Sequence, residues 1–271
     1  MCGRYASARK RIELLEEFSV QRDRVAEDLT PDYNVAPTRS VYAVMDREQR
    51  KSADTDRQRG AAEGEGEGVA RELRVVRWGL VPSWAKDISI GSRLINARAE
   101  TVHEKPSFRR AFARRRCLLP ADGYYEWQVL ENAGPRGGKR KQPYFIHRAD
   151  SGVMAFAGLY ELWRDRAVPD GDPDAWLWTA TIITTSAPDE LGQIHDRMPM
   201  VIAPESWADW LDPGNSDASD LRALLAPAAA RGLATYPVST EVNSVRNNGP
   251  ELMQAVPAPL APGAALWSDQ D

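Results

Sequence analysis

The chain has 271 residues, of which 42% are hydrophobic and 27% are charged, with a formal net charge of -4. This composition is typical of a globular protein with a full core, and no apolar run approaches the roughly 20 residues of a membrane span. Charged residues interrupt the N-terminal segment, which therefore lacks the apolar stretch of a signal peptide. Two cysteines are too few for a disulfide framework, so we expect a cytoplasmic protein.

The first part of the chain is predicted to contain one helix and two strands that flank an insertion. Residues 8–18 carry apolar side chains at helical spacing, and residues 29–38 follow as a loop before a strand at 41–45. Residues 46–72 contain almost no large apolar side chain, so this segment cannot bury enough surface to offset its ordering entropy. We therefore expect a mobile insertion there, followed by a strand at 73–78.

The second part is predicted to be rich in strands. The segments GYYEW and PYFI, separated by the polar loop 131–142, are typical of a hairpin. Ser186 and Asp189 have the spacing of a capping box, which predicts a helix from residue 187. The remaining expected elements are strands at 153–160, 177–184 and 200–203 and helices at 106–115, 204–211 and 219–226.

Strands dominate without regular alternation of strand and helix, which favours an α+β protein with a mainly antiparallel sheet. We find no internal repeat. We expect a single domain over residues 1–255, with the mobile insertion at 46–72 inside it, and a loosely ordered tail at 256–271.

A cysteine stands directly behind the initiator methionine, a position that is usually frayed and poorly suited to a core. If Met1 is removed, Cys2 carries both an α-amine, with a pKa of about 8, and a thiol. A neutral amine attacks an aldehyde to form an imine, and the adjacent thiol can close on that imine to give a thiazolidine ring. An internal cysteine has no free amine, so this chemistry depends on the terminal position.

Three further segments supply polar side chains that suit such a nucleophile. Asn96 and Arg98 lie two apart in a predicted extended stretch and so share a face, although an edge strand with exposed polar residues explains the pattern equally well. Glu126 lies between Tyr125 and Trp127, where partial desolvation would raise its pKa. A solvent-facing glutamate is the alternative.

His195 and Arg197 precede an apolar segment, and a histidine there can titrate near neutrality, unless it is a structural residue bonded to backbone. His103 lies in a charged stretch and His147 follows the segment PYFI, so we expect neither histidine to be catalytic. The two cysteines and three histidines show no pair at CxxC or HxxxH spacing, so we expect no metal and no cofactor.

Basic residues cluster locally despite the acidic total. Residues 109–116 read RRAFARRR, and Arg4, Arg98 and Arg197 flank the candidate chemical residues, which makes a positive groove plausible. A proline-bounded loop presents Trp84 as a candidate stacking platform for single-stranded nucleic acid. Solvated arginines and core tryptophans are the plainer explanation.

Nine segments in order along the chain resemble the SRAP (SOS response-associated peptidase) family, also called abasic site processing proteins. They are MCGRYA, YNVAPT, WGLVPSWAKD, LINARAET, CLLPADGYYEW, AGLYELW, TIITTSA, IHDRMPMVI and VNSVRNNGPEL. The departures, at 46–72, at 165–175 and in the Ala/Pro tail, lie outside these motifs.

The resemblance implies a compact α+β domain with a barrel-like β core that covalently captures abasic sites in single-stranded DNA, with peptidase-like removal of Met1 and lyase-type chemistry. The implied nucleophile is Cys2, with Asn96 positioning it, Glu126 shuttling protons and His195 acting on the opened sugar. Phosphates would be held by Arg4, Arg98 and Arg197, and bases by Trp84 and the loop from Asn34 to Pro37.

The resemblance further implies a DNA damage role, with the protein associated with the nucleoid when bound to DNA, and we expect a monomer. Two alternatives remain open from the residues. One is an N-terminal cysteine peptidase or amidohydrolase, in which the thiol attacks a carbonyl. The other is a non-covalent module that binds single-stranded DNA.

Overall fold

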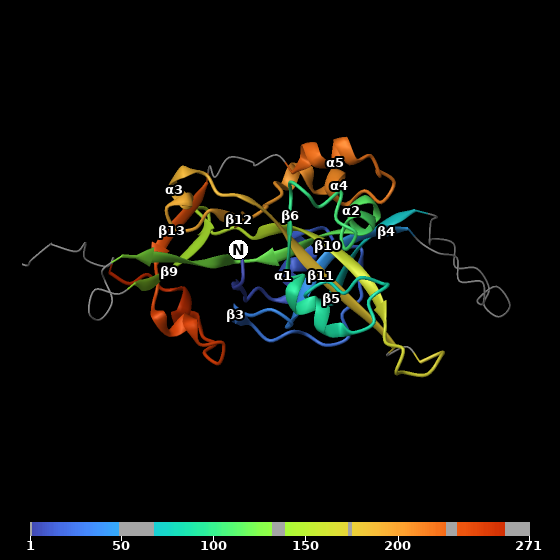
Figure 1. Ribbon diagram of the computed structural model, residues 1–271, viewed down its shortest axis with the longest axis horizontal. Helices are drawn as coiled ribbons and strands as arrows, with labels where there is room; N and C mark the ends of the chain where they lie inside the picture. The colour runs from blue at the N-terminus through green and yellow to red at the C-terminus, as the bar shows by residue number, and fades with distance from the viewer. Residues whose placement is uncertain (1, 49–67, 132–138, 173–174, 226–231, 258–271) are drawn as a thin grey trace, which may run out of the picture.

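The computed structural model describes residues 2–48, 68–131, 139–172, 175–225 and 232–257, and the fold is α+β as predicted (Figure 1). The strands are β1 (Tyr5–Ser7), β2 (Arg22–Asp23), β3 (Asp32–Val35), β4 (Ser40–Glu48), β5 (Val69–Trp78), β6 (Asn96–Arg98), β7 (Arg116–Ala121), β8 (Gly123–Leu130), β9 (Arg140–Arg148), β10 (Met154–Arg164), β11 (Trp176–Ser186), β12 (Arg197–Pro199) and β13 (Leu233–Pro237). The α-helices are α1 (Arg11–Glu17), α2 (Arg109–Arg114), α3 (Asp189–Gly192), α4 (Trp207–Leu211) and α5 (Ala218–Leu224), and shorter 3-10 turns include η1 (Ile88–Arg93) and η5 (Thr240–Asn243).

Five strands close into a barrel. The pairs β11–β10, β10–β7, β7–β4 and β4–β5 are antiparallel, and the parallel pair β5–β11 closes the ring. An odd number of strands cannot alternate in direction all the way round, so one pair has to be parallel. A barrel this narrow is filled by side chains.

A second sheet packs beside the barrel, with the strand order β13-β9-β8-β1-β3. Figure 1 shows β9 and β13 toward the left, β4, β5, β10 and β11 toward the right, and the N-terminus near the middle. Strand β1 therefore brings the start of the chain to the region between β9 and β13 on one side and the barrel on the other. Its register pairs Tyr5 with both Val35 and Tyr124.

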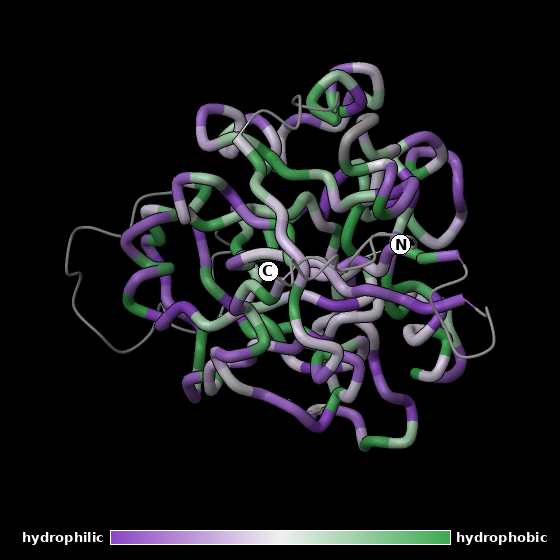
Figure 2. The backbone as a smooth tube through the Cα atoms, turned by 90° about the vertical axis from the view of Figure 1, so that its left-hand side faces the viewer, coloured by the Kyte–Doolittle hydropathy of each residue, from purple (hydrophilic) through white to green (hydrophobic). Residues whose placement is uncertain are grey.

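Alternate residues of the barrel strands pack on opposite sides, as strand geometry requires. In β4, Ala43 and Met45 pack with Tyr5 and Tyr124 of the second sheet, whereas Val44 packs with the buried faces of α1, α2, α4 and α5. The helices therefore cover the outside of the barrel, and its interior is continuous with the second sheet. Hydropathy accordingly alternates over short stretches of backbone (Figure 2).

Several predicted boundaries were wrong. Residues 46–48 and 69–72 are not part of an insertion but extend β4 and β5, since their backbone pairs regularly from Ser40↔Arg77 to Glu48↔Val69. The middle of the predicted insertion, residues 49–67, lies outside the described residues, as do 258–271 of the predicted tail. Helices α1 and α2 are shorter than predicted, and the predicted hairpin is confirmed as β8 and β9.

Two further corrections concern segments near the candidate site. The predicted loop 29–38 contains strand β3, which pairs with β1. The strand expected at 200–203 is instead β12, three residues earlier, with only an isolated bridge at Val201. The predicted capping box is absent, because the short helix α3 has Pro188 at its N-cap, with no side-chain hydrogen bond.

Within the described parts of the chain, every helix is too short or too polar to cross a membrane. The same residues contain no cluster of three His, Cys, Asp or Glu side chains arranged to hold a metal ion.

Candidate active site

Cys2 is fully buried, contrary to the expectation of a frayed terminus. Its side chain is 0% exposed and packs in the core shared by the barrel and the second sheet. Burial, with a smaller contribution from the charge of Glu126, raises the pKa of the Cys2 thiol well above its usual range. The sulfur is therefore a neutral thiol at neutral pH and not a preformed thiolate.

Asn96 contacts Cys2 directly. Its Nδ2 donates a hydrogen bond of 2.7 Å to the backbone carbonyl of Cys2. The predicted extended stretch is strand β6, which runs parallel to β11 with Asn96 opposite Ile182, so the sheet fixes the direction of the carboxamide. Its Oδ1 is buried without a hydrogen-bond partner in the described structure and remains available as an acceptor.

Glu126 is a buried carboxyl group and not a solvent-facing one. It is 4% exposed, and burial raises its pKa to about 7. Side chains alternate along β8, since Tyr124 packs in the same core as Cys2 while Tyr125 packs in a separate cluster on the other face. A carboxyl group that titrates near neutrality is suited to both accepting and donating a proton.

A small pocket brings Glu126, His195 and Arg197 together, with Tyr124 in its wall. Burial, and then the charges of Cys2 and Glu126, raise the pKa of Tyr124 well above its usual range, which places this phenol near both groups. Residues from β8 and from the α3–β12 connection thus converge beside Cys2.

His195 is two-thirds buried, and burial lowers its pKa. The backbone N–H of Arg197 donates to His195 Nδ1 at 3.0 Å, while Asp196 Oδ1 lies 3.0 Å from the same nitrogen. A neutral ring that accepts from Arg197 at Nδ1 carries its proton on Nε2. Nε2–H is then the donor of the ring.

Arg197 is not free to bind phosphate in this structure. Its terminal nitrogens donate to both carboxylate oxygens of Glu100, at 2.6 and 3.1 Å, and to Thr184 O at 2.6 Å. The side chain is only 13% exposed. The DNA-contacting role predicted for Arg197 would require this arrangement to open.

Arg4 and Asn34 are also used internally. Arg4 Nη1 donates to Asn34 Oδ1 at 2.7 Å and to Val242 O at 2.8 Å. Asn34 is 3% exposed, and its Nδ2 donates to the carbonyls of Val242, Ser244 and Asn247. Both side chains therefore anchor the 242–247 segment, and Asn34 is too buried to touch a base here.

The exposed members of the predicted DNA-binding set are Arg98 and Trp84, which is 54% exposed, and Pro37 is half-buried. The arginines at 109–116 do not form one solvated face. Arg109, Arg110 and Arg114 are exposed, whereas Arg116 is 2% exposed. Its guanidinium donates to the carbonyls of Phe112, Trp210, Asp212 and Asn215 and is a structural group.

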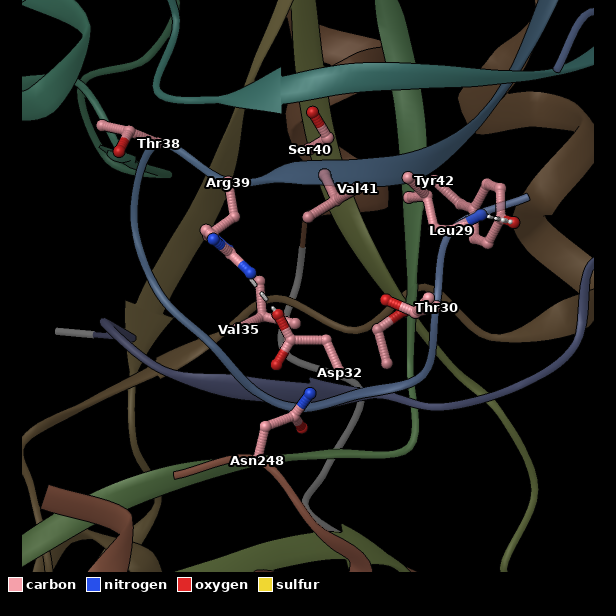
Figure 3. Close-up of a pocket in the computed structure, with 11 residues that line it drawn as sticks. Leu29, Thr30, Asp32, Val35, Thr38, Arg39, Ser40, Val41, Tyr42 and Asn248 are labelled. Atoms are coloured by element: carbon pink, nitrogen blue, oxygen red, sulfur yellow. Dashed lines mark hydrogen bonds and ion pairs between the residues drawn. The ribbon is translucent and has the colours of Figure 1, made fainter. Parts of the chain in front are cut away.

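A second pocket lies between β3 and β4, next to the predicted base-contacting loop (Figure 3). Arg39 and Asp32 point toward each other across it, with 3.9 Å between Nε and Oδ2. None of the four predicted catalytic residues, all of which are described, lines this pocket. The candidate chemistry therefore belongs to the region around Cys2.

Two residues of the site escaped the sequence analysis as candidates. Tyr124 shares the face of Glu126, and strand alternation already indicated that. Glu100 lies two positions after Arg98 in the ARAET segment, but only the fold shows that its carboxylate faces Arg197, which is 97 positions away.

The chain is similar to proteins named for abasic site processing. It is 38% identical to the abasic site processing protein YoqW of Bacillus subtilis over 94% of this chain and 100% of that protein. It is 30% identical to the abasic site processing protein HMCES of Xenopus tropicalis over 90% of this chain and 72% of that protein. A crystal structure of a protein from Bacteroides thetaiotaomicron matches with a TM-score of 0.74 at 26% identity, covering 94% of this chain and 100% of that one.

Residues 1–245 match the family described as SOS response associated peptidase (SRAP). This match covers β1 to β13 and contains every candidate residue around Cys2. By sequence and by fold, the chain belongs to the SRAP family.

Proposed function

We propose that this protein processes abasic sites by capturing them covalently through Cys2 once Met1 has been removed. The observation that carries the proposal is the hydrogen bond from Asn96 to the carbonyl of Cys2, with the buried carboxyl group of Glu126 close enough to affect the pKa of the thiol. The names of the relatives support abasic DNA as the substrate.

The proposed reaction has two bond-forming steps. The neutral α-amine of Cys2 adds to the aldehyde of the opened abasic sugar, and loss of water gives an imine. The thiol then adds across the carbon–nitrogen double bond, so that sulfur bonds to carbon and its proton ends on nitrogen. Burial keeps the thiol protonated, which suits ring closure after the amine has reacted.

Glu126 and His195 divide the proton transfers in this proposal. With a pKa of about 7, Glu126 accepts a proton from the amine and returns it to the departing water, and it serves the same purpose during hydrolysis of the Met1–Cys2 bond. His195, neutral with its proton on Nε2, donates to the sugar ring oxygen as the ring opens.

We propose that the DNA strand is held by Arg98, Trp84 and Pro37, of which the first two are exposed and Pro37 is half-buried. Arg98 offers a guanidinium fork for phosphate, Trp84 offers a stacking face, and Pro37 lies in the connection between β3 and β4. A single strand requires no base flipping to present the sugar. We propose that the protein acts on such strands as a cytoplasmic monomer, with one domain over 1–255 followed by the tail at 256–271.

The test is incubation with an abasic oligonucleotide followed by denaturing electrophoresis. The expected result is a denaturation-resistant complex with single-stranded abasic DNA that is weak or absent with duplex. Cys2→Ser keeps the amine but lacks sulfur, so it is expected to give no stable complex. Blocking the amine by adding one residue before Cys2, with the sulfur intact, is expected to abolish capture.

Two outcomes would overturn the proposal. Full crosslinking by the protein with the blocked amine would exclude amine attack and favour a thiol acting alone, as in a cysteine peptidase. Tight binding without any covalent product would favour a non-covalent module. Mass spectrometry of the purified protein establishes in each case whether Met1 is present.

A further inference from the structure

The guanidinium of Arg197 is clamped by a carboxylate that does not line the pocket. Nη1 and Nη2 each donate to one oxygen of Glu100, and Nη2 also donates to Thr184 O. A bidentate pair of this kind fixes the plane of the guanidinium as well as its position. The hydrogen bonds from Arg197 lower the pKa of Glu100, so its carboxylate is ionised at neutral pH.

This clamp joins two short strands across β11. Strand β12 has only three residue pairs with β11, and β6 pairs with β11 from the other side. Thr184 O accepts a hydrogen bond of 2.6 Å from Arg197 Nη2 and another of 2.9 Å from the backbone N–H of Ala99. The Glu100–Arg197 pair therefore connects the strand that carries Asn96 to the strand that follows His195.

The backbone of Arg197 in turn determines how His195 is protonated. Its N–H and the carboxylate of Asp196 compete for the same ring nitrogen, Nδ1, each at 3.0 Å. The N–H requires Nδ1 to be an acceptor, whereas the carboxylate requires Nδ1 to carry a proton. The Asp196 side chain is 85% exposed, but the Arg197 N–H is held by the strand and by its own clamped side chain.

We propose that Glu100 is a positioning residue that, through Arg197, keeps His195 in the tautomer with its proton on Nε2. Arg197 lines the pocket, but in this structure its terminal nitrogens are held by Glu100. The effect on the tautomer depends only on the structure. Its consequence for the reaction rests on the proposed function.

Nitrogen-15 NMR of the histidine side chains measures the tautomer directly, with His195→Gln identifying the signal. In the native chain, we expect Nδ1 to be unprotonated and Nε2 protonated. Glu100→Gln is expected to produce a population with the proton on Nδ1, and Asp196→Asn in the same chain is expected to reverse it. Glu104→Gln makes the same change four positions away, beside His103, and is expected to leave the His195 signal unchanged.

Arg197→Lys provides a second test, because it keeps the charge but cannot form the bidentate pair. It is expected to shift the tautomer as Glu100→Gln does, and circular dichroism verifies that both variants fold. A native tautomer in both folded variants would overturn the proposal.

Crosslinking rates test the consequence for the reaction. Glu100→Gln is expected to slow capture of abasic single-stranded DNA about tenfold, part of what a general acid contributes. In a chain that also carries His195→Ala, the same change is expected to have no further effect. Losses that multiply in the double variant would overturn the proposal. Failure of the native protein to crosslink would contradict the proposed function, while the NMR measurement would still test the clamp.

Discussion

The carboxamide of Asn96 donates to the backbone carbonyl of Cys2 across 2.7 Å, and this contact joins the start of the chain to a strand 94 positions away. A side chain that binds the backbone of a nucleophile fixes it without consuming its reactive atoms. In the proposed reaction, the contact leaves both the thiol of Cys2 and, once Met1 is removed, its amine without a bond to Asn96 while the residue is held in place.

Replacing Asn96 by alanine is expected to slow crosslinking at least about fivefold, because one hydrogen bond contributes about 1 kcal/mol. Asn96→Asp keeps the shape but cannot donate at neutral pH, so it is expected to be at least as slow. Rates from denaturing gels check this, with thermal unfolding as the control for folding. Native rates in both variants would show that the contact is incidental.

Glu126 makes the stability of the protein dependent on pH. Its pKa is about 7 in the folded chain, above the usual value of a glutamate, so the folded state binds the proton more tightly than the unfolded state. The stabilisation is fully present below about pH 4 and is lost as the pH rises through 7. Relative to Glu126→Gln, the wild type is expected to lose on the order of 3 kcal/mol between pH 4 and pH 8.

Denaturant unfolding of both proteins at several pH values measures this difference. A constant difference across the range would show that the carboxyl group titrates normally. The same Glu126→Gln change is expected to slow crosslinking by about 100-fold, the lower end of what a general acid or base contributes, without reducing affinity for undamaged single strands.

Arg98 and Arg197 were both candidate phosphate ligands, but Arg197 is clamped by Glu100 whereas Arg98 is exposed. Arg98 is exposed, so Arg98→Ala is expected to weaken binding of single-stranded DNA and to reduce the salt dependence of log K by about 1. Arg222→Ala, an exposed charge on α5, serves as the control and is expected to leave the slope unchanged. Fluorescence anisotropy at several salt concentrations measures the affinity and its dependence on salt for both variants. Equal slopes of log K against log salt for Arg98→Ala and the native protein would show that Arg98 does not contact a DNA phosphate.

Trp84→Ala is expected to weaken the same binding by about 1–3 kcal/mol, the contribution of one stacked base. Trp176 is similarly exposed, at 51%, and lies outside the predicted set, so Trp176→Ala is the matched control. Equal effects of the two changes would argue for general hydrophobic contact and against a stacking platform at Trp84.

Arg116 is expected to be essential for folding and not for DNA binding. Removing its guanidinium takes one hydrogen-bond donor from each of four backbone carbonyls, so Arg116→Ala is expected to cost about 3–5 kcal/mol. Arg114→Ala, two positions earlier and exposed, is expected to change stability by less than about 0.5 kcal/mol. Denaturant unfolding distinguishes the two, and similar small losses would show that water replaces the guanidinium.

The sequence predicted those elements whose burial pattern is regular over many residues. The hairpin of β8 and β9 and the long strands β10 and β11 have alternating or continuous apolar residues, and each was located within a few positions. Strand β12 was misplaced and β3 missed because each is only three or four residues long. The ends of β4 and β5 were missed because most of their side chains are polar or small, and their backbone pairing is what makes them strands.

The candidate site was predictable in its members but not in its connections. The motifs identified Cys2, Asn96, Glu126 and His195 one by one. In the structure, Asn96 binds the carbonyl of Cys2, and Glu126 and His195 line the same pocket. The burial of Cys2 and the clamp on Arg197 depend on pairings between distant segments. Composition and spacing carry no information about such pairings.

The parallel pairing of β6 with β11 has a consequence during synthesis. Asn96 takes its place opposite Ile182, so roughly two thirds of the polypeptide must leave the ribosome before the carboxamide can be positioned against Cys2. At ordinary translation speeds this leaves the nascent amino terminus without its partner for about ten seconds or more. A polypeptide that stops short of residue 182 begins with the same MCGRY and has none of this environment, so the special character of Cys2 belongs to the finished fold and not to the first residues made.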